Sequence, residues 1–139
     1  EIRLSIGVHP YQREKMAVRS NHSTSRDAVT RFEVLERFKG AAFVKVLPKT
    51  GRTHQIRVHL AAIGCPVLAD ALYSGRSSIE PKFFGGPKNS PAVLSRQALH
   101  ATSITLNHPV TGERMTFSSP LPSDIQGVLD GLQKYASVS

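Results

Sequence analysis

Two runs of high β-propensity on either side of a Lys39-Gly40 turn constrain the fold most. Residues 29–38 place Phe32, Val34 and other apolar side chains in one extended run, and residues 42–47 form a second such run. Two β-prone runs joined by a short glycine-containing turn are typical of an antiparallel hairpin. Pro48 to Gly51 then stops the second strand. The sequence therefore predicts a β-hairpin in the first half of the chain.

After the hairpin, the spacing of apolar residues changes from that of a strand to that of a helix. Ile56, Leu60 and Ile63 recur at i, i+4 and i+7, which predicts one buried helical stripe. Thr53 is the expected N-cap, and Gly64 is the expected C-terminal glycine. Arg57 falls on the flank of this stripe, so we expect it to be half-buried beside a cleft.

The remaining segments complete a fold of the α+β class. Apolar and polar residues alternate from Ile2 to Ile6, which predicts a strand at the very start of the chain. We therefore expect the chain to begin inside a domain. Residues 101–107 and 113–118 predict a strand pair around a turn at 108–112, and a helix is expected from Pro122-Ser123 to about Tyr135. Residues 74–91 predict a long irregular loop. We expect one domain over 1–139, built on a mostly antiparallel sheet with a few packed helices.

The charge balance favours a polyanionic partner. The chain has a net charge of +8, and the stretch from Arg37 to Arg57 holds six basic residues and no acidic one. A solvated surface explains such a run equally well. No apolar run approaches the roughly 18 residues of a membrane helix, and no leader is recognisable. With a single cysteine, Cys65, a cytoplasmic protein without membrane contact is the expectation.

Two blocks of sequence carry a family resemblance. The first reads LPKTGRTHQIRVHL at residues 47–60 and continues to Asp70-Ala71-Leu72-Tyr73. The second comprises RQALHA at 96–101, HPVTGE at 108–113 and PLP at 120–122. In this order they closely resemble the signatures of RluA-type RNA pseudouridine synthases, over about residues 1–125. The resemblance implies that the chain is the C-terminal portion of that family's catalytic domain.

The resemblance implies an isomerase that converts uridine to pseudouridine in structured RNA, ribosomal or transfer, without cofactor or metal. The family's catalytic aspartate lies in a His-Arg-Leu-Asp segment, which has no match here. None of the four aspartates of the chain is assigned as the catalytic residue; they are Asp27, Asp70, Asp124 and Asp130. We therefore expect the parent protein to be the enzyme and this chain alone to be inactive. The alternative is a non-catalytic RNA-binding or structural fragment.

Three residues are carried over from the family's active site. Arg57 corresponds to the arginine that pairs with the catalytic aspartate. With that carboxylate missing, we expect Arg57 to bind solvent, a carbonyl group or an anion, because an unpaired buried charge is unfavourable. Leu60 corresponds to an apolar position near the uracil, although a core role is about twice as probable on general grounds. Tyr73 resembles a family tyrosine whose expected task is packing beneath the active site, with direct substrate contact as the less favoured alternative.

A second group of residues is expected to contact the RNA backbone. Free N–H groups at the start of a helix favour a phosphate. The residues concerned are Lys49, Arg52, Thr53, His54 and Gln55. For Thr53, His54 and Gln55 taken singly, a cap or an exposed side chain without ligand is an equally good interpretation.

Other chemistry receives little support from the sequence. His54 and His59 lie about 140° apart around a helix, and no carboxylate completes a metal site. Cys65 precedes a proline and has no positioned base, which argues against a thiol nucleophile. An exposed sheet edge predicts self-association or a partner strand.

Overall fold

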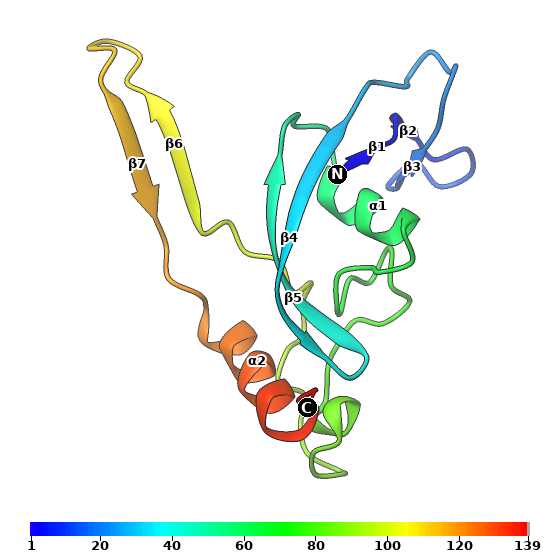
Figure 1. Ribbon diagram of the computed structural model, residues 1–139. Helices are drawn as coiled ribbons and strands as arrows, with labels where there is room; N and C mark the ends of the chain where they lie inside the picture. The colour runs from blue at the N-terminus through cyan, green and yellow to red at the C-terminus, as the bar shows by residue number, and fades with distance from the viewer. Residues whose placement is uncertain (139) are drawn as a thin grey trace.

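The computed structural model describes residues 1–138 and has the expected α+β class (Figure 1). One sheet has three antiparallel strands in the order β1-β4-β5, and two further strand pairs lie apart from it. The elements of the first part are β1 (Ile2–Arg3), β2 (Ile6–Val8), β3 (Met16–Val18), β4 (Val29–Phe38), β5 (Ala41–Pro48) and α1 (Gln55–Ala62). The elements of the second part are η1 (Pro81–Phe84), β6 (Ser103–Asn107), β7 (Arg114–Ser118) and α2 (Ser123–Tyr135).

The β4–β5 hairpin confirms the prediction made from the two β-prone runs. Phe32 pairs with Val46 and Phe38 with Ala41, and the register shifts once, between Val34 and Glu36. Gly40 takes a φ of 81° at the turn, a conformation that glycine adopts without steric penalty. Strand β5 forms one edge of the sheet; self-association through that edge stays a prediction.

Helix α1 packs on the small β2–β3 pair and on β4. Ile6, Ala28 and Val58 form a compact buried cluster here, with Met16 and Tyr73 packed against it. Strand β3 was not expected from the sequence, because its three residues are too few to show a period. This cluster fixes the position of α1, which carries Arg57.

The larger core lies under α2, which begins and ends where the sequence predicted. Its buried Ile125, Val128 and Leu132 pack with Phe84 of η1 and with Phe38 of β4. Residues 74–91 contain the short helix η1 and otherwise turns, bends and irregular backbone. They nevertheless contribute Ile79 and Phe84 to the core, so the segment has a packing role that its composition did not indicate.

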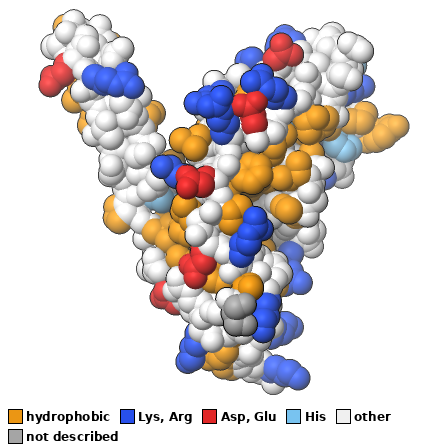
Figure 2. Space-filling model, in the orientation of Figure 1, with side chains coloured by type: hydrophobic (Ala, Val, Ile, Leu, Met, Phe, Trp, Pro, Cys, Tyr) orange, Lys and Arg blue, Asp and Glu red, His pale blue; other side chains and the backbone are white. Residues whose placement is uncertain are grey.

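Strands β6 and β7 form an arm that projects from the rest of the molecule. Their register pairs Ile104 with Phe117 and Leu106 with Met115, which places four apolar side chains on one face of the hairpin. All of these except the half-buried Met115 are exposed. The arm and the main body enclose a V-shaped gap, and basic side chains gather on the upper and lower ends of the body (Figures 1 and 2).

No helix within residues 1–138 combines the length and the apolar composition needed to cross a membrane.

Candidate active site

The segment that leads into α1 is held by the side chain of Gln55. Its Oε1 atom accepts hydrogen bonds from the Thr50 hydroxyl at 2.6 Å and the Arg52 N–H at 3.0 Å. Its Nε2 atom donates to the Val29 carbonyl at 2.9 Å and to the Thr30 hydroxyl at 3.0 Å. Gln55 therefore ties the Thr50–Arg52 turn to β4 and fixes where α1 begins.

The expected N-cap at Thr53 is wrong. His54 occupies the N-cap position with a φ of 54°, and no side chain caps the helix there. Because Gln55 supplies the acceptor for the preceding turn, local capping preference is overridden by contacts with β4. At the other end the prediction holds: Gly64 has a φ of 80°, and its N–H donates to the Ala61 carbonyl.

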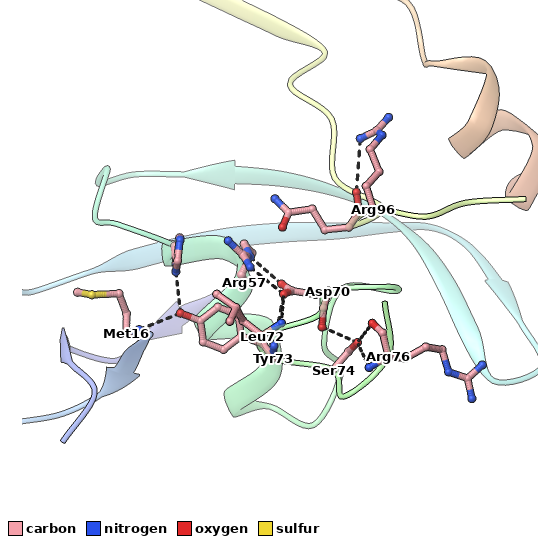
Figure 3. A network of polar contacts seen from close by, with 10 residues as sticks. Met16, Arg57, Asp70, Leu72, Tyr73, Ser74, Arg76 and Arg96 are labelled. Carbon is pink, nitrogen blue, oxygen red and sulfur yellow. Dashed lines mark hydrogen bonds and ion pairs between the residues drawn. The ribbon is translucent and has the colours of Figure 1, made fainter. Parts of the chain in front are cut away.

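Arg57 projects from α1 onto Asp70, and the two side chains form a bidentate ion pair (Figure 3). The Arg57 Nε atom donates to Oδ2 at 2.7 Å, and Nη2 donates to Oδ1 at 2.8 Å. The Arg57 side chain is 13% exposed and that of Asp70 is fully buried. The expectation that Arg57 lacks a carboxylate partner is therefore wrong, because the turn after α1 returns Asp70 to it.

The Asp70 carboxylate is itself held by the backbone that follows it. Oδ1 also accepts the N–H groups of Leu72 at 3.1 Å and Tyr73 at 3.3 Å (Figure 3). Ala69 has a φ of 58° and is buried, which turns the chain back toward α1. Only glycine adopts this left-handed conformation without strain, so the tight turn places an unusual demand on Ala69.

Tyr73 lies beneath the Arg57 guanidinium. The Arg57 Cζ atom is 5.0 Å from the centre of the Tyr73 ring, and Lys15 Nζ is 5.4 Å from it. The hydroxyl accepts the Met16 N–H at 2.9 Å and lies 2.8 Å from His54 Nδ1 (Figure 3). Tyr73 thus joins β3, the start of α1 and the Asp70 turn in one contact network.

The burial and charges of this network shift its pKa values in consistent directions. Burial acts to raise the pKa of Asp70, but the Arg57 hydrogen bonds and charge and two backbone N–H groups outweigh it, so the pKa is lowered. The Asp70 hydrogen bonds raise the pKa of Arg57. Desolvation, with the Arg57 charge, lowers the pKa of His54, and desolvation raises that of Tyr73. The site therefore favours an ionised pair beside neutral His54 and Tyr73.

Arg57 lines an open cleft of about 430 Å³. One wall comes from α1 and the turn after it, with Arg57, Ala69 and Ala71, and the opposite wall comes from residues 95–99. Arg96 also lines this cleft, but its guanidinium points away from Arg57 (Figure 3) and binds Asp124 at 2.9 and 3.0 Å. Arg57 is therefore the cation best placed to receive an anionic group in the cleft.

The residues expected to bind RNA divide into two groups. Lys49, Arg52 and Thr53 are exposed, and His54 is half-buried beside Tyr73. Gln55 is buried, and both its amide atoms are engaged inside the protein, so its side chain has no atom available for a phosphate. Leu60 is half-buried on α1.

Two residues important to the site were not singled out from the sequence. Asp70 is the partner of Arg57, and Lys15 lies over Tyr73. The turn that returns Asp70 depends on the left-handed backbone of Ala69, which the residue type does not signal. Among residues 1–138, no three His, Cys, Asp or Glu side chains are grouped as a metal site would require.

Comparisons with known proteins agree on one family. The family model described as RNA pseudouridylate synthase matches residues 1–62. Ribosomal large subunit pseudouridine synthase D of Pseudomonas aeruginosa is 43% identical over 129 residues, which are 93% of this chain and 39% of the relative. The protein of the same name from Xanthomonas campestris is 42% identical over 132 residues, 93% of this chain and 38% of the relative. The chain thus spans about two fifths of the length of these relatives.

Two solved human structures share the fold. RNA Pseudouridylate Synthase Domain Containing 4 is 26% identical with a TM-score of 0.67, covering 95% of this chain and 55% of that one. RNA Pseudouridylate Synthase Domain Containing 1 is 24% identical with a TM-score of 0.63, covering 99% of this chain and 60% of that one. At 24% identity, the likeness to RNA Pseudouridylate Synthase Domain Containing 1 supports the fold alone.

Proposed function

The chain belongs to the RluA-type RNA pseudouridylate synthase family, and from this premise we propose that the protein containing it converts specific uridines in structured RNA to pseudouridine. The observation that carries the proposal is Arg57, held at the edge of an open cleft by a bidentate carboxylate. The names of the bacterial relatives make ribosomal RNA the first substrate to test and transfer RNA the second. The cytoplasm is the compartment that such a substrate implies.

The proposed reaction breaks the bond from uracil N1 to ribose C1′ and joins C5 to C1′. C5 loses its hydrogen as a proton and N1 gains a proton, so the product is an isomer of the substrate. An arginine beside the reacting carboxylate keeps that carboxylate ionised and fixes its orientation. Arg57 is placed for this task because it is charged, partly buried and open to the cleft on one side. No cofactor or metal enters the proposed mechanism.

The catalytic carboxylate does not come from the aspartates of this chain. Asp70 is fully buried, and its two oxygens already accept four hydrogen bonds from within the protein, so its carboxylate is not accessible to a substrate. Asp27 is exposed and accepts a hydrogen bond from the Ser5 hydroxyl at 3.4 Å. Asp124 binds Arg96, and Asp130 accepts a hydrogen bond from Gln126 on the exposed side of α2. We therefore assign the nucleophile to an aspartate outside these 139 residues, on the same protein or on a partner.

Leu60 and Tyr73 complete the proposed site. Leu60 is half-buried on the same helix as Arg57, where its side chain is proposed to pack against the uracil ring. The Tyr73 hydroxyl is engaged by Met16 and His54. This supports a role for Tyr73 in packing beneath the site and orienting Arg57, without contact with the substrate.

The RNA backbone is proposed to cross the exposed residues before α1. Lys49, Arg52 and Thr53 are exposed next to one another, and half-buried His54 follows them at the start of the helix. Exposed lysine and arginine side chains bind phosphates with little dependence on sequence. This surface would position the substrate while the uridine enters the cleft.

The alternative is a non-catalytic RNA-binding or structural role. The absence of a free aspartate beside Arg57 within residues 1–138 favours it for the chain acting alone. The two functions predict different products: the alternative gives bound RNA in which every uridine is unchanged.

Hydrogen release from C5 tests the proposed function. RNA labelled with tritium at uridine C5 is incubated with the native protein, and tritium in water is measured. We expect release by the wild type and a loss of about 100-fold or more in Arg57→Ala, since a misplaced reacting group costs about that much. Arg37→Ala removes an exposed arginine of β4 and is the matched control. RNA binding without tritium release by the wild type would favour the alternative.

A further inference from the structure

Asp70 uses only one edge of the Arg57 guanidinium. A guanidinium carries five N–H donors in a rigid plane. The Asp70 carboxylate takes the Nε–H and one Nη2–H, at 2.7 and 2.8 Å. The second Nη2–H and both Nη1–H donors form no hydrogen bond within the described residues. One Nη2–H and one Nη1–H of these three lie parallel and form a second edge of the guanidinium, which can bind another carboxylate end-on.

The Asp70 carboxylate is a rigid support for this pairing. It is fully buried, and the N–H groups of Leu72 and Tyr73 hold Oδ1 from the other side. The Arg57 guanidinium also rests on the Tyr73 ring at 5.0 Å. The plane and the direction of the guanidinium are therefore fixed from two sides before any substrate binds.

We infer that Asp70 is a positioning residue, which fixes Arg57 by its Nε edge so that the opposite edge presents its donors to the catalytic carboxylate. This rests on the proposed function, because it assigns Asp70 a task in that reaction. In this arrangement Arg57 bridges two carboxylates: a buried one that sets its geometry and a second one that it orients in the cleft. Asp70 itself touches no reacting atom.

Double-mutant kinetics in the native protein test the inference. Asp70→Asn keeps the side-chain shape, removes the charge and places an N–H group against the N–H donors of Arg57. We expect its kcat for pseudouridine formation to fall by about 100-fold with KM changed by less than about twofold. The double variant with Arg57→Ala should be no slower than Arg57→Ala alone, because Asp70 acts through Arg57. Asp130→Asn, an exposed aspartate of α2, is the matched control.

A second measurement reports the geometry directly. Solvent exchange of the Arg57 Nε–H, followed by nitrogen-15 NMR, should be at least about tenfold slower than that of exposed Arg37. It should become fast in Asp70→Asn and remain slow in Asp130→Asn. If Asp70→Asn fails to fold, the wild-type exchange rate still decides: a rate equal to that of Arg37 overturns the inference.

The outcomes separate this inference from the proposed function. An active wild type with an equally active Asp70→Asn would overturn the positioning role alone. If the rate losses of the two single variants multiply in the double variant, the positioning role is also overturned, because Asp70 would then act independently of Arg57. An inactive wild type would overturn the proposed function, and the exchange measurement would then still show whether Asp70 fixes Arg57.

Discussion

The Nδ1 atom of His59 on α1 lies 2.7 Å from the Thr30 hydroxyl on β4, and both side chains are fully buried. The other ring nitrogen, Nε2, donates to the Leu4 carbonyl at 2.8 Å. His59 therefore joins α1 to β4 and to the segment between β1 and β2. The histidine that follows Arg57 by two residues is a structural link, and it holds the helix that carries the proposed active-site arginine.

Replacement of His59 by leucine should destabilise the protein. The change removes two hydrogen bonds and leaves the partly buried Leu4 carbonyl without its histidine partner, and an unsatisfied buried group costs about 1–3 kcal/mol. We expect the free energy of unfolding to fall by about 2–4 kcal/mol in urea titrations. His22→Leu, whose ring bonds only to nearby Thr24, should change it by less than about 0.5 kcal/mol. Equal effects of the two variants would show that the buried link contributes nothing.

Acid should weaken the protein through Asp70. The pKa of Asp70 in the folded state is below its ordinary value of 3.8, so the Arg57–Asp70 pair stabilises the fold above that pH. The stabilisation is lost as the pH falls through the lowered pKa. We expect the free energy of unfolding to drop below about pH 4. Asp70→Asn should be less stable at pH 7 by about 3 kcal/mol and show a flatter acid profile, whereas Asp130→Asn should follow the wild type.

Gly131 should not tolerate a side chain. A Cβ atom there would lie 2.4 Å from Cζ of Phe84, and the ring is fixed in the core. Alanine favours a helix by about 1 kcal/mol over glycine, yet overpacking costs about 1–3 kcal/mol. We expect Gly131→Ala to lower the thermal midpoint. Gly127→Ala on the same helix meets only one Val93 methyl, at 3.0 Å, and should be clearly the more stable of the two. Reversal of that order would contradict the packing of Phe84 against α2.

RNA binding should depend on salt through the residues before α1. Each phosphate contact contributes about 0.7–0.9 to the slope of log K against log salt. Lys49→Ala and Arg52→Ala are therefore each expected to reduce the slope by about 1 with a uridine-containing RNA hairpin. Lys82→Ala in η1 and Arg37→Ala in β4 remove exposed charges elsewhere and serve as the matched controls. Equal slopes in all four variants would argue for diffuse attraction without a defined RNA path.

The sequence predicted the elements whose pattern is local. The β4–β5 hairpin, the turn at Gly40 and the full length of α2 follow from strand propensity, glycine and helical spacing. Residues whose role depends on distant contacts were not predictable in this way. Phe84 is buried because α2 packs on η1, and Ile79 lies in the same core cluster, although the segment that contains them is rich in serine, glycine and proline.

The sequence identified single residues of the candidate site but not the carboxylate that pairs with Arg57. Arg57 and Tyr73 were identified by their motif, and both lie in one network with His54. The partner of Arg57 depends on the backbone of Ala69, which turns the chain with a φ of 58°. Residue type alone does not indicate that conformation, because alanine is rarely left-handed. Gln55 was misjudged for a related reason, since its burial is set by β4.

The pairing of Arg57 with Asp70 spans only 13 residues of chain, whereas His59 reaches back 55 residues to Leu4. Closing a short loop restricts the chain less than closing a long one, and local contacts form faster. The partners of residues 54–73 in this network all lie earlier in the chain, so the Arg57–Asp70 pair can form during synthesis before β6, β7 and α2 exist. Because Gln55 and His59 tie α1 to β4, and Met16 of β3 donates to the Tyr73 hydroxyl, the orientation of this local pair depends on the strands that precede it in the chain.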